Sequence, residues 1–578
     1  MNQELEDKIN EYIDMFVKNH GWTNFEFRTG QKEAIIDVVA TCMGEEKKIY
    51  LIDAPTGSGK SLIALCSSYV LNRFGKKGYI LSSDLALQDQ YEQDVLKLHL
   101  GFGSVKGVDN YLCTENQEKH SLGECKMKHL NSNATKQLPC YKDCPYYFAR
   151  DYASFTPTSI FNYSYYLIQM NYVLEKMTDS SHALFDERDF IICDEAHKVV
   201  NIVQKHFSPI VNDNTYPMLE RLRGFLAEHS MAVPYSGYEL KEIINKIVAE
   251  DDNAKLFIHN RMFEKMLHSF VQHADEIKKF VGRKYAGKSV PAEWRKGLNL
   301  CDECKDLHCK FEDYNQIIAS TDIRAMIKNQ NGANIQFNCI NEKYLMKKHF
   351  HDKNNFAVMM TATMGEPTLF AKSINANNAK YRKIPSTFNF DRSPILIYQG
   401  VSMSFKNKEV ALPKIANKIT EILEKHKNEN GIIHTGSYTN SVYLNENIKS
   451  DRIISYINSS DKKNVLFDFS SANNKVLMGP SLLEGLDLGN DKSRFQIFAK
   501  VPYPSLMDKF VNAKMKTDKD WYAWITILSV LQGVGRSVRN ENDYATTYIL
   551  DSDFFRLITQ NRHMFPQDFL DRCVYVRF

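Results

Sequence analysis

The stretch at residues 48–62, KIYLIDAPTGSGKSL, limits what this chain can fold into more than any other. Its apolar run at 49–52 is short enough for a buried strand, and a helical pattern of apolar residues begins at Leu62. A strand, a glycine-rich loop and a helix in this order are the setting of a phosphate-binding loop, whose backbone N–H groups surround the phosphates. The alternative is a glycine turn that only joins the two elements, and we consider it the weaker explanation.

The loop therefore predicts a nucleotide site. We expect Lys60 to reach the outer phosphates and Ser61 to hold magnesium, as these residue types do in phosphate-binding loops. The position that usually carries the first glycine is Ala54 here. The predicted nucleotide contacts in the loop are Thr56, Gly57, Ser58, Gly59, Lys60 and Ser61.

Length and charge restrict the class of protein further. The chain has 578 residues, which exceeds the roughly 250–300 at which a single core stops growing, so we expect several domains. The formal net charge is only +3, so a nucleic-acid partner would need a local basic groove. We find no secretory signal at the start and no apolar run near the ~20 residues of a membrane span. We therefore expect a soluble, cytoplasmic protein, associated with the nucleoid in a bacterium or phage, or nuclear in a eukaryote.

Strand and helix patterns alternate in two series along the chain. Buried strands are predicted at 49–52, 78–82, 190–193 and 356–360, and then at 395–398, 431–434, 475–478, 495–498 and 547–550. Such alternation predicts an α/β fold in which helices cover both faces of each parallel sheet. Long helical patterns without alternating strands fill residues 201–350. The predicted boundaries are 1–107, 151–200 and 351–385 for the first α/β domain, 108–150 and 201–350 for two insertions, and 386–578 for the second α/β domain.

Two carboxylates follow the predicted strand at 190–193. A strand end is the usual place for ligand contacts in such sheets, and a carboxylate there binds magnesium through water. We assign that role to Asp194, and we assign polarisation of the water that attacks the γ-phosphate to Glu195. A solvated acidic loop is the alternative, but the phosphate-binding loop upstream and Ala196-His197 downstream favour the catalytic role.

Two arginines near the C-terminus complete the predicted catalytic set. Arg536 and Arg539 are three residues apart, which places them on one face if this stretch is helical. Guanidinium groups over a γ-phosphate neutralise the charge that develops during its transfer. On their own they would more simply form a basic helix with salt bridges. In the second α/β domain of an ATPase, however, they predict a nucleotide cleft between two sheets.

Gln31 is a candidate for base recognition. Its side-chain amide could hydrogen-bond both edges of an adenine. An exposed glutamine at a helix start is an equally good explanation from the local sequence.

The order of these motifs resembles that of the iron–sulfur XPD/DinG group of superfamily 2 helicases. The resemblance is carried by stretches 27–31, 54–61, 82–90, 194–197, 361–363, 386–394, 481–487, 501–508 and 532–539. It departs from the group at Ala54 and at residues 434–438, where an aromatic pair often precedes the serine. The resemblance implies two RecA-like motor domains, the first with a small iron–sulfur insertion and a helical arch. It adds Asp487 to the nucleotide contacts and Gln532 to the catalytic residues.

The same resemblance implies a function. It predicts an ATP-dependent DNA helicase that moves 5′→3′ on single-stranded DNA and acts on tailed or forked duplexes, with RNA–DNA hybrids as further substrates. We expect a monomer. The alternatives are a translocase that remodels nucleoprotein or R-loops without processive unwinding, and an interaction subunit with a vestigial ATPase. The intact loop, carboxylates and arginines argue against the latter, and too few residues precede Gln31 for a fused nuclease.

Four cysteines fall in the first insertion. Cys113, Cys125, Cys140 and Cys144 are separated by eleven, fourteen and three residues. Four thiolates suit either a 4Fe–4S cluster or zinc, although zinc sites usually use two close pairs. Spacing alone leaves both open, together with unligated core cysteines, whereas the resemblance implies a structural 4Fe–4S cluster. For Cys301, Cys304 and Cys309 we favour core positions over metal binding.

The predicted arch has basic residues mixed with aromatic ones. In the helicase group the arch and the cluster domain enclose a hole for single-stranded DNA, and such channels combine positive charge with stacking rings. A solvated helix face explains each residue equally well, so none is assigned. The residues concerned are Lys279, Phe280, Arg283, Lys284, Tyr285, Trp294, Arg295 and Lys296.

Overall fold

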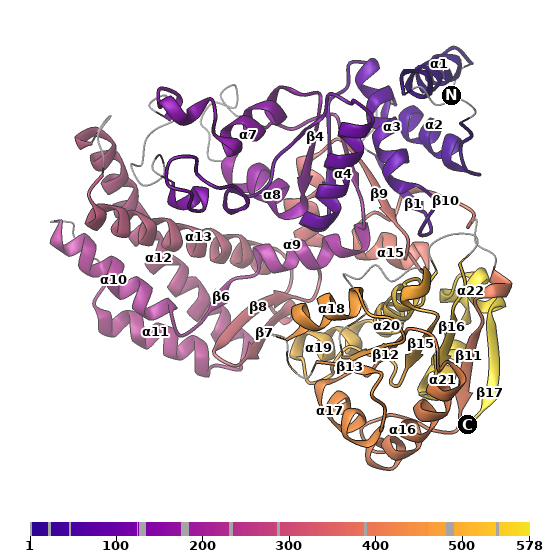
Figure 1. Ribbon diagram of the computed structural model, residues 1–578. Helices are drawn as coiled ribbons and strands as arrows, with labels where there is room; N and C mark the ends of the chain where they lie inside the picture. Colours follow the sequence, from indigo (N-terminus) through magenta and orange to yellow (C-terminus); the bar gives the residue numbers. More distant parts are fainter. Residues whose placement is uncertain are drawn as a thin grey trace.

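Two seven-stranded parallel sheets form the body of the protein (Figure 1). The computed structural model describes residues 3–20, 25–44, 48–123, 125, 135–174, 184–229, 235–285, 290–386, 390–456, 458, 461–480, 482, 490–538 and 543–578. Among these residues, no helix is both long enough and apolar enough to cross a membrane. The α/β prediction with two RecA-like sheets is confirmed.

The first sheet has the spatial order β10-β1-β9-β5-β2-β4-β3. Its strands are β1 (Lys48–Asp53), β2 (Gly78–Ser82), β3 (Gly103–Ser104), β4 (Thr158–Asn162), β5 (Phe190–Cys193), β9 (Phe356–Thr361) and β10 (Lys380–Lys383). The second sheet has the order β13-β14-β12-β15-β16-β11-β17. Its strands are β11 (Ile395–Gln399), β12 (Gly431–His434), β13 (Ile453–Ser455), β14 (Val476–Gly479), β15 (Phe495–Phe498), β16 (Thr546–Ile549) and β17 (Cys573–Arg577).

Side chains of the central strands enter cores on both faces of the first sheet. In β1, Tyr50 and Ile52 pack into one core, while Leu51 packs into the other. Successive strand residues point to opposite faces, so a strand buried on both sides is a continuous apolar run. Helices α1 (Gln3–Asn19), α2 (Gln31–Cys42) and α3 (Lys60–Arg73) contribute to the Tyr50 core, and α8 (Tyr163–Ile168) and α9 (Val199–Phe207) contribute to the Leu51 core.

Two insertions project from the first sheet. The four cysteines of the first lie in or near short helices that end with α7 (Pro145–Phe155). The second, the arch, contains α10 (Thr215–Glu228), α11 (Gly237–Ala249), α12 (Asn253–Lys284) and α13 (Ala292–Ser320), which extend to the left in Figure 1.

The sequence predicted an entirely helical arch, but the arch also contains strands. An antiparallel sheet, β6 (Ile210–Val211), β8 (Asn334–Cys339) and β7 (Met326–Asn331), forms its base. Asn331 pairs with Asn334 across a two-residue turn in which Gly332 has a φ of +59°. The Asn331-Gly332 step was a hairpin signal available in the sequence. Strands β3, β4, β10, β13 and β17 of the large sheets were also missed.

A helix pair of the second domain packs against the arch base. Helix α19 (Lys509–Thr517) lies beside β7, and its Lys514 forms a buried ion pair with Glu342, which precedes α14 (Lys343–His349). The two side chains are only 8% and 9% exposed. Burial raises the pKa of Glu342, and Lys514 opposes that rise. This pair ties the second motor domain to the arch.

Removing one member of this pair should destabilise the protein. We expect Lys514→Met to cost about 3–5 kcal/mol, because it leaves the Glu342 carboxylate buried without a cation. Thermal unfolding monitored by circular dichroism checks this, with Lys516→Met as the control, because Lys516 is an exposed residue on the same helix. The double variant Lys514→Met/Glu342→Gln should recover most of the loss. A double variant no more stable than Lys514→Met would contradict the pairing.

Candidate active site

The glycine-rich loop has the geometry that a phosphate site requires. Strand β1 ends at Asp53, and the Ala54 N–H donates to the carbonyl of Thr361 (2.9 Å) at the end of β9. Gly57 and Gly59 adopt left-handed φ values of +78° and +81°, which favour glycine. Helix α3 then begins at Lys60, so its free N–H groups face the loop.

Gln31 supports this loop directly. It begins α2 and is only 3% exposed, so the alternative of an exposed helix-start glutamine is wrong. Its amide accepts from the Arg28 N–H (2.7 Å) and donates to the Ser58 carbonyl (2.6 Å). A Cβ atom at Gly59 would lie 2.2 Å from Gln31 Nε2, so only glycine fits there. One donor hydrogen and one acceptor lone pair of the amide remain for a base.

Asp194 is held at the end of β5 with both carboxylate oxygens occupied. The Tyr91 hydroxyl donates to Oδ2 (2.9 Å), and the Glu195 N–H donates to Oδ1 (2.8 Å). The side chain is buried, and burial together with the neighbouring Glu195 raises its pKa, while Lys60 opposes the rise. A buried carboxylate with a raised pKa is a favourable site for a cation.

Glu195 shows the opposite electrostatic behaviour. Burial acts to raise its pKa, but the positive charges of Lys60, His197, Lys198 and Arg536 outweigh burial and lower it. The residue has a left-handed φ of +51°, an uncommon backbone state outside glycine that often occurs at active sites. Glu195 is therefore ionised at neutral pH and suited to accept a proton.

A chain of hydrogen bonds connects the DEAH stretch to the second domain. His197 Nδ1 hydrogen-bonds Thr361 Oγ1 (2.9 Å), which also accepts from the Thr363 N–H (3.1 Å). From the other sheet, Gln532 Nε2 donates to Thr363 Oγ1 (3.4 Å). The two domains thus meet through side chains on either side of the loop after β9.

A cleft of about 330 Å³ separates the domains at this point. The first domain contributes Thr56, Glu195 and His197, and the second contributes Gln532 and Arg536. Of these, Thr56, Glu195, Gln532 and Arg536 are site candidates from the sequence, and all four line the same cleft.

The local structure around Arg536 differs from the prediction. Helix α20 (Lys519–Val534) ends before Arg536, which lies in the following turn, so its predicted place on a helix face is wrong. Glycines at 533 and 535 favour that ending, because glycine is a poor helix former. Arg539 and Asp487 lie outside the described residues.

Several residues that line the cleft had not been predicted. Asp53 follows the apolar run of β1, and Asp568, Phe569 and Arg572 belong to or follow α22 (Gln567–Asp571) in the second domain. Burial raises the pKa of Asp53 to about 6, although Lys383 opposes the rise. No sequence signal marks the three distant residues, because only the packing of the two domains brings them to the loop.

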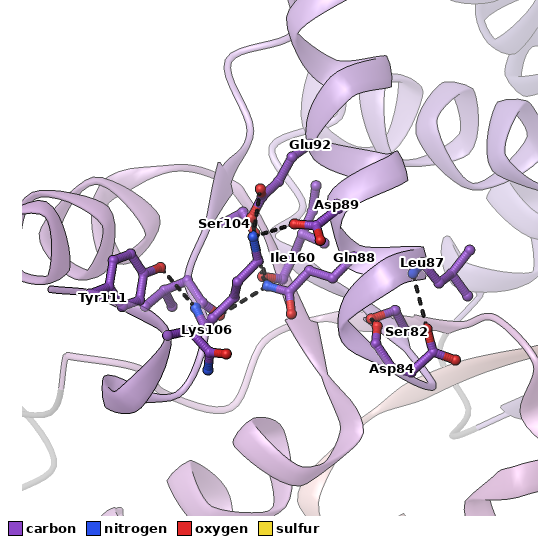
Figure 2. Close-up of polar contacts among 12 residues, drawn as sticks. Ser82, Asp84, Leu87, Gln88, Asp89, Glu92, Ser104, Lys106, Tyr111 and Ile160 are labelled. Atoms are coloured by element: carbon purple, nitrogen blue, oxygen red, sulfur yellow. Dashed lines mark hydrogen bonds and ion pairs between the residues drawn. The ribbon is translucent and has the colours of Figure 1, made fainter. Parts of the chain in front are cut away.

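The stretch at 82–90 connects the first sheet to the cysteine-bearing insertion (Figure 2). Asp84 caps α4 (Leu85–Lys97) by accepting from the Leu87 N–H (3.0 Å). The fully buried Gln88 amide donates to Ser104 Oγ (2.9 Å) and to the carbonyls of Val105 (3.0 Å) and Ile160 (3.2 Å). Helix α4 is therefore fixed to the strands that lead into the insertion.

The four cysteines of the insertion lie close to one another. Cys113, Cys125 and Cys144 are buried, and Cys125 and Cys144 share a small apolar cluster with Tyr147. Burial raises the pKa of the Cys140 and Cys144 thiols, and the charges of Cys125 and Cys113 raise both further. A Cβ atom on Gly123 would approach Cys113 Sγ to 3.1 Å, so glycine leaves room beside that thiol.

The four thiols do not form a preformed metal site. Among the residues that the structure describes, no three histidine, cysteine or acidic side chains gather closely enough to hold a metal ion. The 4Fe–4S cluster that the family resemblance implies therefore stays a prediction for these cysteines.

The arch candidates mostly belong to its core. Cys301 and Cys304 are fully buried in α13, and burial raises the pKa of Cys301 to about 11, as expected for core thiols. Trp294 is 8% exposed and packs against the rings of Phe225 and Phe280. Trp294 is therefore not an exposed stacking surface.

Comparisons with known proteins agree with this geometry. Residues 414–569 match the family described as Helicase C-terminal domain, and residues 24–219 match the family described as Type III restriction enzyme, res subunit. The chain is 22% identical to the ATP-dependent DNA helicase YoaA of Escherichia coli, over 91% of this chain and 92% of that protein. A 96-residue stretch is 36% identical to the E. coli ATP-dependent DNA helicase DinG, covering 15% of this chain and 13% of DinG. The solved structure of S. tokodaii Xpd4 superposes with a TM-score of 0.60 at 13% identity, covering 94% of this chain and 99% of that one.

The buried Asp53 carboxyl should make stability depend on pH. Its pKa is about 6 in the fold against 3.8 in the open chain, so the native state retains a proton that the unfolded chain releases between these values. Wild-type stability therefore falls as pH rises from about 4 to about 6 and is then constant. Asp53→Asn lacks this titration. Its free energy of unfolding relative to the wild type should rise by about 2–3 kcal/mol from pH 4 to pH 7.

Chemical denaturation at several pH values measures this difference. The exposed Asp520→Asn in the second domain is the control. A difference between Asp53→Asn and wild type that does not change with pH would show that Asp53 is not held in its protonated form.

Proposed function

We propose that the chain is an XPD/DinG-like helicase of superfamily 2 that moves 5′→3′ along single-stranded DNA and unwinds duplex by hydrolysing ATP. The observation that carries this proposal is the position of Glu195. Glu195 and Arg536 of the second domain line the same cleft, and the positive charges of Lys60 and Arg536 both lower the pKa of Glu195. A nucleotide bound in this cleft would lie close to both cations.

Each residue of the proposed site has a separate role in ATP hydrolysis. The loop at 56–61 binds the phosphates, with Lys60 on the outer ones. Ser61 and Asp194 would hold magnesium, which neutralises charge on the β- and γ-phosphates. Glu195 orients the attacking water and accepts its proton, and its lowered pKa keeps the carboxylate ionised before the reaction. Arg536, together with Arg539, stabilises the charge that develops on the γ-phosphate.

The base and the catalytic glutamine complete the site. We assign adenine recognition to Gln31, which has hydrogen-bonding capacity left after its contacts with the loop. We assign Gln532 to coupling the state of the nucleotide to domain closure, because it already contacts Thr363 across the cleft. Asp487 is a further proposed contact on the nucleotide.

The cysteine-bearing insertion is proposed to hold a 4Fe–4S cluster through Cys113, Cys125, Cys140 and Cys144. The cluster would supply structural order and no redox chemistry for ATP hydrolysis. Cys113 lies beside Gly123, and Cys125 and Cys144 belong to a small cluster with few apolar residues of its own. Small lobes of this kind commonly depend on a bound metal for stability.

Strand displacement on duplexes with a 5′ tail, a 3′ tail or no tail tests the proposal, with ATP turnover followed in the same samples. We expect displacement of the 5′-tailed duplex alone. Turnover should be lost in Lys60→Ala and Glu195→Gln, and should fall by about 10³-fold or more in Arg536→Ala. Arg556→Ala, whose side chain is 70% exposed in the same domain, is the matched control. Turnover stimulated by single strands without displacement would indicate a translocase, and near-normal turnover in Lys60→Ala would refute the site.

The cluster makes a separate prediction. Anaerobically purified protein should contain four iron atoms per chain, and Cys144→Ser should lose them. Because the cysteines are remote from the cleft residues, this variant should retain more ATP hydrolysis than unwinding. Cys42→Ser, outside the insertion, should change neither. Zinc in place of iron would contradict the assignment. Equal loss of ATP hydrolysis and unwinding would show that the cluster only stabilises the fold.

A further inference from the structure

Tyr91 lies where it can control the orientation of a proposed magnesium ligand. It is fully buried in α4, on the side that faces the end of β5. Its hydroxyl donates to Asp194 Oδ2 (2.9 Å). The phenol thus contacts one of the two residues proposed to hold the ion.

We propose that Tyr91 is a positioning residue that orients the Asp194 carboxylate for magnesium, an inference that rests on the proposed ATPase. An ionised carboxylate can only accept hydrogen bonds, and the phenol O–H supplies one to Oδ2. This bond fixes the rotation of the carboxylate and leaves its remaining lone pairs available to the ion or to water bound by the ion.

The Asp194 carboxylate is held at both of its oxygens. While Tyr91 donates to Oδ2, the other oxygen, Oδ1, is fixed by the Glu195 N–H (2.8 Å). Hydrogen bonds from such supporting groups commonly determine metal affinity.

Helix α4 is itself anchored on its opposite side. Lys106 forms ion pairs with Asp89 and with Glu92 Oε2 (2.9 Å), and Ser104 Oγ donates to Glu92 Oε1 (2.7 Å), as Figure 2 shows. Together with the hydrogen bonds of Gln88, these contacts fix the first two turns of α4 to the neighbouring strands. Tyr91 therefore projects from a rigid support and not from a loop.

Tyr91→Phe tests the inference because it removes the hydroxyl and keeps the ring. Binding of a fluorescent ADP analogue would be measured against magnesium concentration, and again in EDTA. We expect the magnesium concentration for half-maximal binding to rise about ten- to hundred-fold, with binding in EDTA unchanged. The control is Tyr166→Phe, a 1% exposed tyrosine whose hydroxyl donates to the Lys353 carbonyl (3.0 Å) far from the cleft.

A second measurement distinguishes a specific effect on magnesium binding from a general loss of stability. If Tyr91 acts through Asp194, the combination Tyr91→Phe/Asp194→Asn should raise the magnesium requirement by less than the product of the single effects. A magnesium dependence equal to that of Tyr166→Phe, or fully multiplicative effects, would overturn the inference and leave the proposed function intact. Absence of magnesium-dependent nucleotide binding in the wild type would refute the proposed function itself, and this inference with it.

Discussion

The ionised carboxylate of Glu195 is the point on which the rest of the site depends. It lies on the first sheet, but its charge is stabilised by Lys60 from that sheet and by Arg536 from the other. A half-buried carboxylate would otherwise tend to have a raised pKa. The low pKa of Glu195 therefore depends on the distance between the two domains. Opening of the cleft would remove Arg536 and raise the pKa of this carboxylate.

Helix α20 connects the cleft to contacts between the domains that lie farther away. Its C-terminal end presents Gln532 to Thr363, while in its middle Trp524 Nε1 donates to the Met364 carbonyl (3.1 Å). At its start, Asp518 pairs with Lys372 of the first domain (2.7 Å), beside the α19 helix that contacts the arch base. A movement of the second domain at the nucleotide must therefore displace contacts along the whole helix, including those next to the arch.

Much of the fold could be read from apolar runs, and the exceptions have physical reasons. Strands such as β1 and β5 are central and buried on both faces, so they appear in the sequence as short apolar stretches. The edge strand β17 has exposed side chains, and β4 (TSIFN) contains small polar residues that are buried only in the assembled sheet. No local pattern distinguishes such segments from loops.

The same division applies to the site. The phosphate-binding loop and the Asp194-Glu195 pair are local motifs and were recognisable from spacing. Tyr91 was not, because it is a single tyrosine in an amphipathic helix whose role arises only when α4 packs beside β5.

The opposite pKa shifts of the two adjacent carboxylates show how the fold separates their roles. Asp194 and Glu195 are consecutive residues and both carry a carboxylate. Burial and repulsion from Glu195 raise the pKa of Asp194. The positive charges of Lys60, His197, Lys198 and Arg536 lower the pKa of Glu195. The first carboxylate thus lacks a sufficient positive partner within the protein, and a divalent cation would supply one. The second already has its partners and is free to act as a base. Environments that move two pKa values apart identify which group performs which step, and here the left-handed backbone at Glu195 is what turns the two neighbours toward different surroundings.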